Sequence, residues 1–392
     1  MRGFLRAGQA KVFFTVVFIA VVLCSLSAQE GSRAVPVRSD HYTVLSDAGD
    51  GAQVSRELES RFAVYNRLFR FDTANTAFPL QVRVYRNTET YNNYVSARLG
   101  EIRPGAVYLH YNQEGRRELV INRLSADEGK ILPYQAFVQF LRAFIPNPPS
   151  WMREGFAIYF STLTFNDSGE ISYEENLSWL DTVKKLGPNA ASAEAILLAD
   201  KQIFPPDFQS LSWALVSFFL NSGSDDYFRT ITESFMVLSP SATAAENSEA
   251  VFRRVGLWNS YDSLSGDYKS YIASRKTFAE LIEEGQRAYT SGDKVVAELA
   301  FLSALDQKPV HYAPYYYLGL LAYDENNYDM AEQYYHSSIQ YGADKALVSY
   351  ALGVNAASAG RKTDAVNYLR TAAAANPAKY REKAESLIQR LR

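Results

Sequence analysis

The stretch HYAPYYYLGLLAYDENNYDMAEQYYHSSIQYGAD, residues 311–344, is one copy of a motif that occurs three times near the C-terminus. Its glycine, Gly319, has equivalents 34 residues before and after it, at Gly285 and Gly353. Small residues recur twelve positions after each glycine, at Ala297, Ala331 and Ala365. Because antiparallel helices approach closely only where side chains are small, these positions mark helix crossings. The period therefore predicts three stacked helix pairs.

Other positions keep the same phase. Turn-forming residues separate the two helices of each pair, at Gly292, Asn326 and Gly360. Bulky residues recur at Phe301, Tyr335 and Leu369. The motif resembles the tetratricopeptide repeat (TPR) family over residues 278 to about 379. The last segment, AKYREKAESLIQRLR, is typical of the polar helix that closes such a stack.

The TPR resemblance implies a groove lined by the first helix of each repeat, which receives a protein or peptide partner. The matching positions carry large side chains, several of them tyrosines with one polar tip, which suit peptide recognition. These positions are Ile282, Gln286, Tyr289, Tyr316, Leu320, Tyr323, Tyr350 and Val354. The alternative is that some of these side chains pack within the solenoid or against the preceding domain.

The region before the repeats mixes strands with helices. Alternating apolar residues predict strands at 41–46 and 80–85, and a hairpin joins 106–111 to 118–124 around NQEGRR. Between the first two strands, apolar residues at helical spacing predict one helix over about 51–70. From about residue 132 onward the pattern is mainly helical. We therefore expect an α+β domain over 37–275, followed by an all-α solenoid over 278–392.

One phrase in the helical part, PSWMREGFAIYF at residues 149–160, resembles the gluzincin peptidases of the group called peptidase MA. There a proline and a tryptophan precede a Glu-Gly pair that opens an amphipathic helix, here Glu154-Gly155. The resemblance implies a zincin-like domain in which Glu154 corresponds to the third zinc ligand. The run SLSWALVSFFL, 210–220, resembles a helix that such proteins carry downstream.

The catalytic chemistry of that family is missing from the sequence. A gluzincin needs two histidines at i and i+4 with a glutamate beside the first, which serves as general base for zinc-bound water. The register of the phrase puts Gln135 and Gln139 at the histidine positions and Ala136 at the glutamate. A shift of one residue would bring Tyr134 into play but supplies no histidine. We therefore expect no metal and no cofactor.

Three alternatives stay open for this segment. The glutamines could be an ordinary solvated helix face, the domain could be an unrelated α/β fold, or the site could be a working hydrolase of unusual composition. If Glu154 still points into a cleft, its carboxylate needs a partner. We expect Arg142 or Arg153 to supply the replacement cation, with the two glutamines donating hydrogen bonds.

No other catalytic group stands out. The four histidines, His41, His110, His311 and His336, are not paired at ligand spacing. Asp167-Ser168-Gly169 occurs once and is expected to be a simple turn. The only cysteine, Cys24, lies in the N-terminal segment, so the rest of the chain has neither a disulfide nor a thiolate nucleophile.

The N-terminal residues predict export. Arg2, Arg6 and Lys11 precede a short apolar run at 12–24 and then small residues, the pattern of a secretory signal over 1–28. Retention as an anchor and lipid attachment at Cys24 stay open. An exported chain without disulfides suits a bacterial periplasm. The net charge of −3 and the lack of a basic tract argue against nucleic acid as a partner.

Together these patterns predict an exported binding or scaffold protein, with a catalytically silent zincin-like domain and a protein-binding TPR domain. The former cleft could hold a peptide along the edge strand near 106–111. One alternative is an active zinc-dependent peptidase with a non-standard site. Another is a structural spacer that binds nothing.

Overall fold

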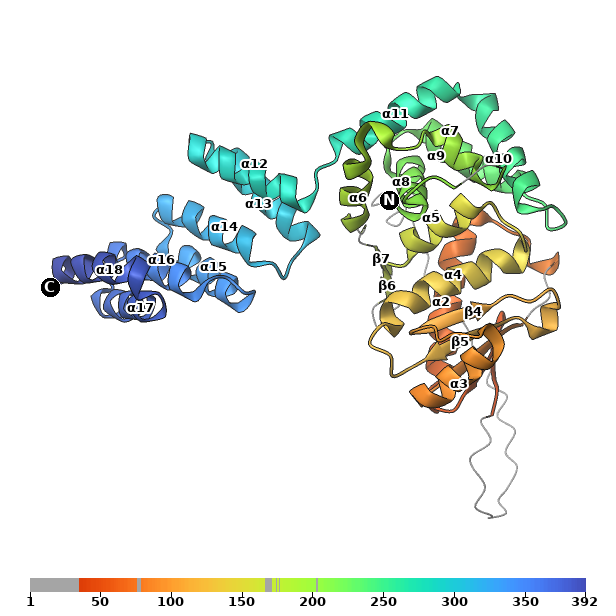
Figure 1. Cartoon of the computed structure of the whole chain (residues 1–392), viewed down its shortest axis with the longest axis horizontal. Coiled ribbons are helices and arrows are strands. Elements are labelled where there is room, and N and C mark those ends of the chain that lie inside the picture. The colour runs from red at the N-terminus through yellow and green to blue at the C-terminus, as the bar shows by residue number, and fades with distance from the viewer. Residues whose placement is uncertain (1–34, 76–78, 166–170, 174, 176, 202–203) are drawn as a thin grey trace, which may run out of the picture. The chain divides into compact units, whose positions relative to one another are not determined.

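The structure is a computed structural model that describes residues 35–75, 79–165, 171–173, 175, 177–201 and 204–392 (Figure 1). The predicted secretory signal and the Asp167-Ser168-Gly169 segment lie outside these residues. The chain divides into two compact units, the first ending at Ser274 and the second spanning Arg275–Arg392. Among the helices described, none is both long and apolar enough to cross a membrane.

A five-stranded mixed sheet forms the base of the first unit. Its strands lie in the order β1-β2-β3-β5-β4. The three middle strands are parallel, whereas β1 and β4 run antiparallel at the two edges. The predicted strands and the hairpin are confirmed. Their bounds are β1 Val37–Arg38, β2 Tyr42–Ser46, β3 Leu80–Tyr85, β4 Ala106–Leu109 and β5 Glu118–Asn122.

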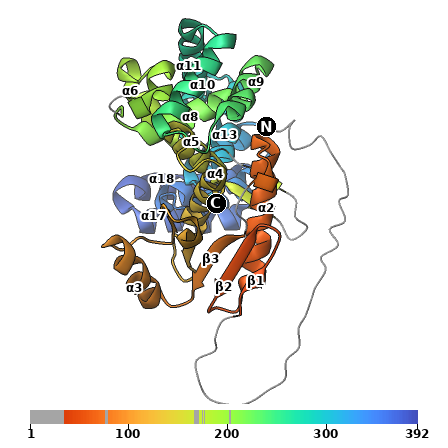
Figure 2. The ribbon, with the colours of Figure 1, turned by 90° about the vertical axis from the view of Figure 1, so that its right-hand side faces the viewer.

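Helices cover both faces of this sheet. The predicted helix near 51–70 is α2, Gly51–Phe69, and it shares one face with α4, Glu128–Phe144. On the other face lies α3, Thr88–Leu99, as Figure 2 shows. The sequence prediction missed α3 because only Tyr91 and Val95 of its residues are buried, too few to produce a clear helical period.

A helical layer follows the sheet. Near its centre, α5 packs against the strongly apolar α8, and Gly155 permits this approach because a Cβ there would lie 2.4 Å from the carbonyl oxygen of Ser212. A two-stranded hairpin, β6 Leu163–Phe165 with β7 Ile171–Tyr173, follows α5. The helices are α5 Ser150–Phe160, α6 Ser178–Leu186, α7 Ala193–Leu197, α8 Phe208–Asn221, α9 Asp225–Ser234, α10 Ala244–Trp258 and α11 Tyr261–Ser274.

Aromatic rings fill the space where α2, α4 and α5 meet. Tyr65 lies 5.2 Å from Phe137, and Phe69 lies 5.0 Å from Phe156, measured between ring centroids. All four are nearly inaccessible to water. Burying each such ring stabilises the fold by about 1.5–3 kcal/mol, so this cluster fixes α4 and α5 against each other.

The second unit is a row of helix pairs (Figure 1), which confirms the predicted repeat architecture. Each pair forms one repeat, and the last helix closes the stack as expected. The helices are α12 Phe278–Ser291, α13 Lys294–Gln307, α14 Tyr312–Asp324, α15 Tyr328–Gln340, α16 Lys345–Ser358, α17 Lys362–Ala375 and α18 Pro377–Leu391.

Each repeat glycine lies against the bulky residue of its partner helix. A Cβ on Gly285, Gly319 or Gly353 would lie 2.5–2.7 Å from Phe301, Tyr335 or Leu369, respectively. The turn residues Gly292, Asn326 and Gly360 have φ values of 85°, 62° and 77°. This left-handed conformation ends the first helix of each pair and is easiest for glycine and asparagine.

Candidate functional site

Glu154 is the centre of a polar cluster between three helices of the first unit. Glu154 lies in α5, and only 9% of the residue is exposed to solvent. Oε1 accepts hydrogen bonds from Nε and Nη2 of Arg153, at 3.1 and 2.9 Å. Oε2 accepts one from the Tyr134 hydroxyl in α4 and one from Nε2 of Gln209 in α8, the latter at 3.0 Å. Both carboxylate oxygens are therefore occupied.

The partners of Glu154 partly match the expectation. Arg153 supplies the replacement cation, as predicted, whereas Arg142 makes no ion pair with Glu154. The prediction that Gln135 and Gln139 donate hydrogen bonds to Glu154 is wrong, because both side chains point at the sheet. Gln209 donates in their place, since the close approach of α8 to α5 at Gly155 brings it within reach.

Gln135 and Gln139 bind the backbone of the sheet. Oε1 of Gln135 accepts a hydrogen bond from the backbone N–H of Tyr108 on the edge strand β4, at 3.0 Å. Nε2 of Gln139 donates to the carbonyl oxygen of Gln81 on β3, at 2.9 Å. Gln139 is 1% exposed, so the alternative of a solvated helix face is wrong for this residue. Its Oε1 is buried and has no donor among the described residues.

The register of α4 against α5 differs from the one inferred from sequence. Tyr134, not Gln135, contacts Glu154. The observed alignment of α4 with α5 is therefore the one shifted by one residue from the alignment inferred from sequence. Ala136 is 1% exposed and lies in the apolar core. The residue one turn after Tyr134 on the same face is Val138, which is also in that core.

The groups around Glu154 do not fit a zinc ion. Zinc in proteins is held by imidazole, thiolate and carboxylate ligands. Here a phenol, an amide and a guanidinium surround a single carboxylate, and the guanidinium already neutralises it. No group of three or more His, Cys, Asp or Glu side chains lies close enough for a metal within the described parts of the chain.

Burial and charge perturb the residues near this cluster. Burial and the Glu154 carboxylate raise the pKa of Tyr134, which keeps its hydroxyl protonated and able to donate. Burial, followed by the nearby cations Arg142, Arg117 and Arg153, lowers the pKa of His110 to about 4. Burial and Arg153 likewise lower the pKa of Arg142. Arg117, Arg142 and Arg153 therefore all lie near the end of β4.

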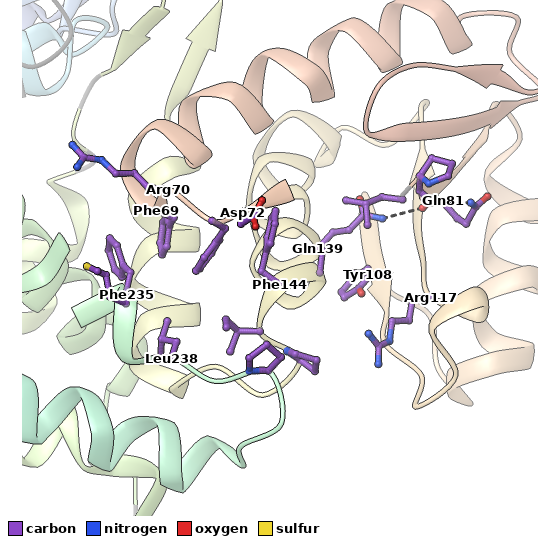
Figure 3. A pocket seen from close by; sticks show the side chains of 18 of the residues that line it. Phe69, Arg70, Asp72, Gln81, Tyr108, Arg117, Gln139, Phe144, Phe235 and Leu238 are labelled. Carbon is purple, nitrogen blue, oxygen red and sulfur yellow. Dashed lines mark hydrogen bonds between the residues drawn. The ribbon is translucent and has the colours of Figure 1, made fainter. Parts of the chain in front are cut away.

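An open cavity of about 980 Å³ lies beside α4 (Figure 3). One end is aromatic: Phe69 and Phe235 stack with ring centroids 4.1 Å apart, and Phe71 and Phe144 stack at 4.7 Å. The other end reaches the sheet and is lined by Gln81, Tyr108, Gln139 and Arg117. Sequence reasoning missed this cavity, because its walls come from distant segments that share no motif.

The predicted groove residues of the second unit lie at equivalent places on α12, α14 and α16. All eight are half-buried, neither sealed in the core nor fully exposed. Several contact neighbouring helices: Tyr350 stacks on Tyr380 of α18 at 5.2 Å, and the Tyr323 hydroxyl lies 3.0 Å from Oγ of Ser358. Burial raises the pKa values of Tyr289 and Tyr316 to about 12, so both hydroxyls are protonated at neutral pH.

The remaining histidines have local roles. Nδ1 of His41 lies 2.7 Å from Oε2 of Glu59, and its ring stacks on Phe62. Nδ1 of His311 accepts a hydrogen bond from the backbone of Ala313 at the start of α14. His336 lies beside Glu332 and Tyr368 on the helical stack. None of these three histidines is among the described contacts of Glu154.

The sequence matches no protein-family model and no curated protein. Among solved structures, the TPR domain of Arabidopsis OM64 is similar to this chain, with 18% identity. The alignment covers 29% of this chain and 94% of that domain, with a TM-score of 0.27. The likeness of the C-terminal helical region to a TPR domain rests on its own 34-residue period and on its row of helix pairs.

Proposed function

We propose that this chain is a binding protein whose second unit holds a protein or peptide partner in the groove that the TPR resemblance implies along α12, α14 and α16. The observation that carries the proposal is the half-burial of all eight side chains at equivalent positions of the three helices. A fully packed side chain has no surface left for a partner, and a fully exposed one has no fixed position. Half-buried tyrosines combine a held ring with an accessible face and a polar tip.

The groove side chains are also held in place before any partner binds. Tyr316, Leu320 and Tyr323 pack on the cluster around Tyr335 and Leu352. Because these rotamers are restricted in the free protein, a partner loses less conformational entropy when it binds. The same contacts account for the intramolecular packing considered above, so both interpretations apply to the same residues.

For the first unit we propose a zincin-like domain that has lost its catalytic chemistry. The order of strands followed by α4 and the Glu154-bearing α5 agrees with the resemblance of residues 149–160. The contacts of Glu154 with Arg153 and Tyr134 support a structural role for its carboxylate. We further propose export, on the basis of the charged and apolar pattern of residues 1–28.

A differential binding experiment tests the groove. The purified chain is immobilised and incubated with a lysate of the source cells, and bound proteins are identified by mass spectrometry. The double variant Tyr316→Ala/Tyr323→Ala should lose the partner. Tyr315→Ala/Tyr341→Ala is the matched control, since these two rings contact each other in a tilted arrangement, with centroids 5.2 Å apart, outside the groove positions. Equal capture by both double variants would contradict the proposal.

Metal analysis separates the binding protein from the peptidase alternative. We expect substoichiometric zinc in the purified protein, with no difference between the wild type and Glu154→Gln. Stoichiometric zinc that disappears in Glu154→Gln, together with chelator-sensitive peptide cleavage, would favour the peptidase.

A further inference from the structure

The cavity beside α4 has two chemically different ends (Figure 3). The aromatic end is formed by two stacked ring pairs, Phe69 with Phe235 and Phe71 with Phe144. The opposite end reaches the sheet and is lined by Gln139 of α4. Cavities of several hundred Å³ with an apolar wall and a few polar groups are the usual form of small-molecule sites.

Gln139 brings one unused hydrogen-bond acceptor to the sheet end. The residue is 1% exposed, and its Nε2 donates to the carbonyl oxygen of Gln81 at 2.9 Å. This bond fixes the orientation of the amide, because turning it over would set Oε1 against that carbonyl oxygen. Oε1 is shut off from water and receives no hydrogen bond from the residues that the structure describes. A buried acceptor without a donor is unfavourable, so the cavity favours a ligand that supplies one.

Other polar groups at the sheet end already have partners. The backbone N–H of Tyr108 donates to Gln135, and Nε of Arg117 donates to the carbonyl oxygen of Tyr111 at 2.7 Å. An extended peptide could not pair with Tyr108 without displacing Gln135, and its own amides would lose hydrogen bonds to water. This counts against the expected peptide groove along residues 106–111 and favours an occupant with a single donor.

The charges that line the cavity favour a neutral occupant. The charged side chains are two arginines and two acids, so their formal charges cancel: Arg70, Asp72, Arg117 and Glu233. Arg70 and Asp72 are exposed to solvent. Glu233 accepts hydrogen bonds from Arg254 and from the Trp258 indole, at 3.0 and 3.1 Å. Because neither sign of charge is in excess, a charged ligand would lose its hydration without gaining a counter-charge.

We propose that the cavity binds a neutral aromatic molecule with one hydrogen-bond donor, of the phenol or indole type, with its donor at Oε1 of Gln139 and its ring against the phenylalanines. Aromatic rings attract one another beyond the effect of buried area, so the phenylalanine end favours a ring over an alkyl group of the same size. The inference concerns the first unit alone and does not depend on the proposed partner groove of the second.

Titration calorimetry of the full purified chain with 2-naphthol, which is neutral at pH 7, tests the proposal. The methyl ether 2-methoxynaphthalene keeps the ring and the oxygen but lacks the donor, and decahydro-2-naphthol keeps the donor but lacks the aromatic ring. We expect one site for 2-naphthol, about tenfold weaker binding of the ether and about threefold weaker binding of the saturated alcohol. Equal affinity for 2-naphthol and its ether, or no saturable binding of 2-naphthol, would overturn the proposal.

Two charged ligands test the preference for a neutral molecule. The anion 2-naphthoate and the cation 2-naphthylmethylammonium carry the same ring. We expect both to bind more weakly than 2-naphthol, because each must give up the hydration of its charge. Tighter binding of either ion would overturn the proposal.

A pair of variants assigns the binding to Gln139. Gln139→Leu removes the acceptor, so 2-naphthol should bind about tenfold more weakly, whereas its methyl ether should not be weakened. Gln135→Leu is the matched control: Gln135 lies one turn earlier on α4 and also binds the backbone of the sheet, but it does not line the cavity. This control should keep the full preference for 2-naphthol. The same preference in both variants would overturn the assignment.

Ala143→Trp tests the location of the site without changing Gln139. Ala143 lines the cavity, and a tryptophan there should fill it and abolish the binding of 2-naphthol and of its ether. Unchanged binding in this variant would place the ligand elsewhere and overturn the proposal. If Ala143→Trp fails to fold, the two glutamine variants decide.

Discussion

Gly319 faces the ring of Tyr335 so closely that a Cβ on the glycine would lie 2.5 Å from Cε1 of the tyrosine. Tyr335 is 1% exposed and belongs to a core cluster shared by its own repeat and the next, so the ring cannot swing outward without leaving the core. The same contact recurs between Gly285 and Phe301, with the same 2.5 Å separation. The helices of each repeat are thus held at a distance that only glycine permits.

We therefore expect Gly319→Ala to destabilise the second unit. The clash should cost about 2–3 kcal/mol, of which the better helix propensity of alanine offsets about 1 kcal/mol. The measurement is urea unfolding followed by circular dichroism, with hydrogen exchange to assign the loss to α14 and α15. Gly266→Ala in α11 is the control, since a Cβ there meets no atom within 4 Å and should stabilise slightly. Equal stability of Gly319→Ala and the wild type would contradict this account.

The carboxylate of Glu154 should act as a structural anchor. Glu154→Ala leaves the Arg153 guanidinium, the Tyr134 hydroxyl and the Gln209 amide without their acceptor. We expect the free energy of unfolding to fall by about 2–3 kcal/mol. This loss is smaller than the loss on breaking a fully buried ion pair, because Arg153 is partly exposed. Glu154→Gln should lose less, since the amide oxygen can still accept.

The control for this loss is Glu249→Ala, which removes an exposed glutamate paired with Lys201 and Arg253. We expect no measurable change in its unfolding curve, as is usual for surface ion pairs. If Glu154→Ala were as harmless as Glu249→Ala, the cluster would have no role in holding α4, α5 and α8 together.

The repeats could be predicted because their contacts are repeated at fixed spacing. Gly319 and Tyr335 are sixteen residues apart, and the same pair of positions recurs in each repeat. The strands of the first unit were also predictable from their alternating apolar residues. In contrast, α3 was missed because most of its surface faces water.

The register of α4 and the cavity could not be predicted. A shift of one residue rotates a side chain by about 100° around a helix, and without histidines the sequence offers no marker that chooses between Tyr134 and Gln135. The cavity depends on Phe69, Phe144 and Phe235, which are far apart in sequence and meet only in the folded chain. A hydrophobic pattern identifies each as a core residue but does not indicate that they share a wall.

Acid should destabilise the first unit through His110. The pKa of this imidazole is lowered from its ordinary 6.5 to about 4, by burial first and then by Arg142, Arg117 and Arg153. The unfolded chain therefore binds the proton more tightly, and the associated stability is full above about pH 6.5 and is lost as pH falls towards 4.

Denaturation at pH 7 and pH 4.5 measures this effect in the wild type and in His110→Gln. Titration of the carboxylates is common to both proteins and cancels in the comparison. The wild type should lose about 1 kcal/mol more than the variant, a discounted figure because His110 is only partly buried. Equal losses would show that His110 is protonated freely in the folded protein.

The register of α4 predicts which substitutions would create a zinc site, if the first unit is zincin-like as proposed. The Tyr134 hydroxyl touches Glu154, and position 138 follows one turn later on the same face. Tyr134→His/Val138→His, combined with Arg153→Gln to release Oε1 of Glu154, should therefore bind zinc stoichiometrically and lose it when Glu154→Gln is added. Gln135→His/Gln139→His in the same background should not, because those side chains point at β4 and β3. Zinc binding by each of the two variants is measured by metal content and by the absorption spectrum of the cobalt-loaded protein. Zinc in the second variant but not in the first would restore the register inferred from sequence.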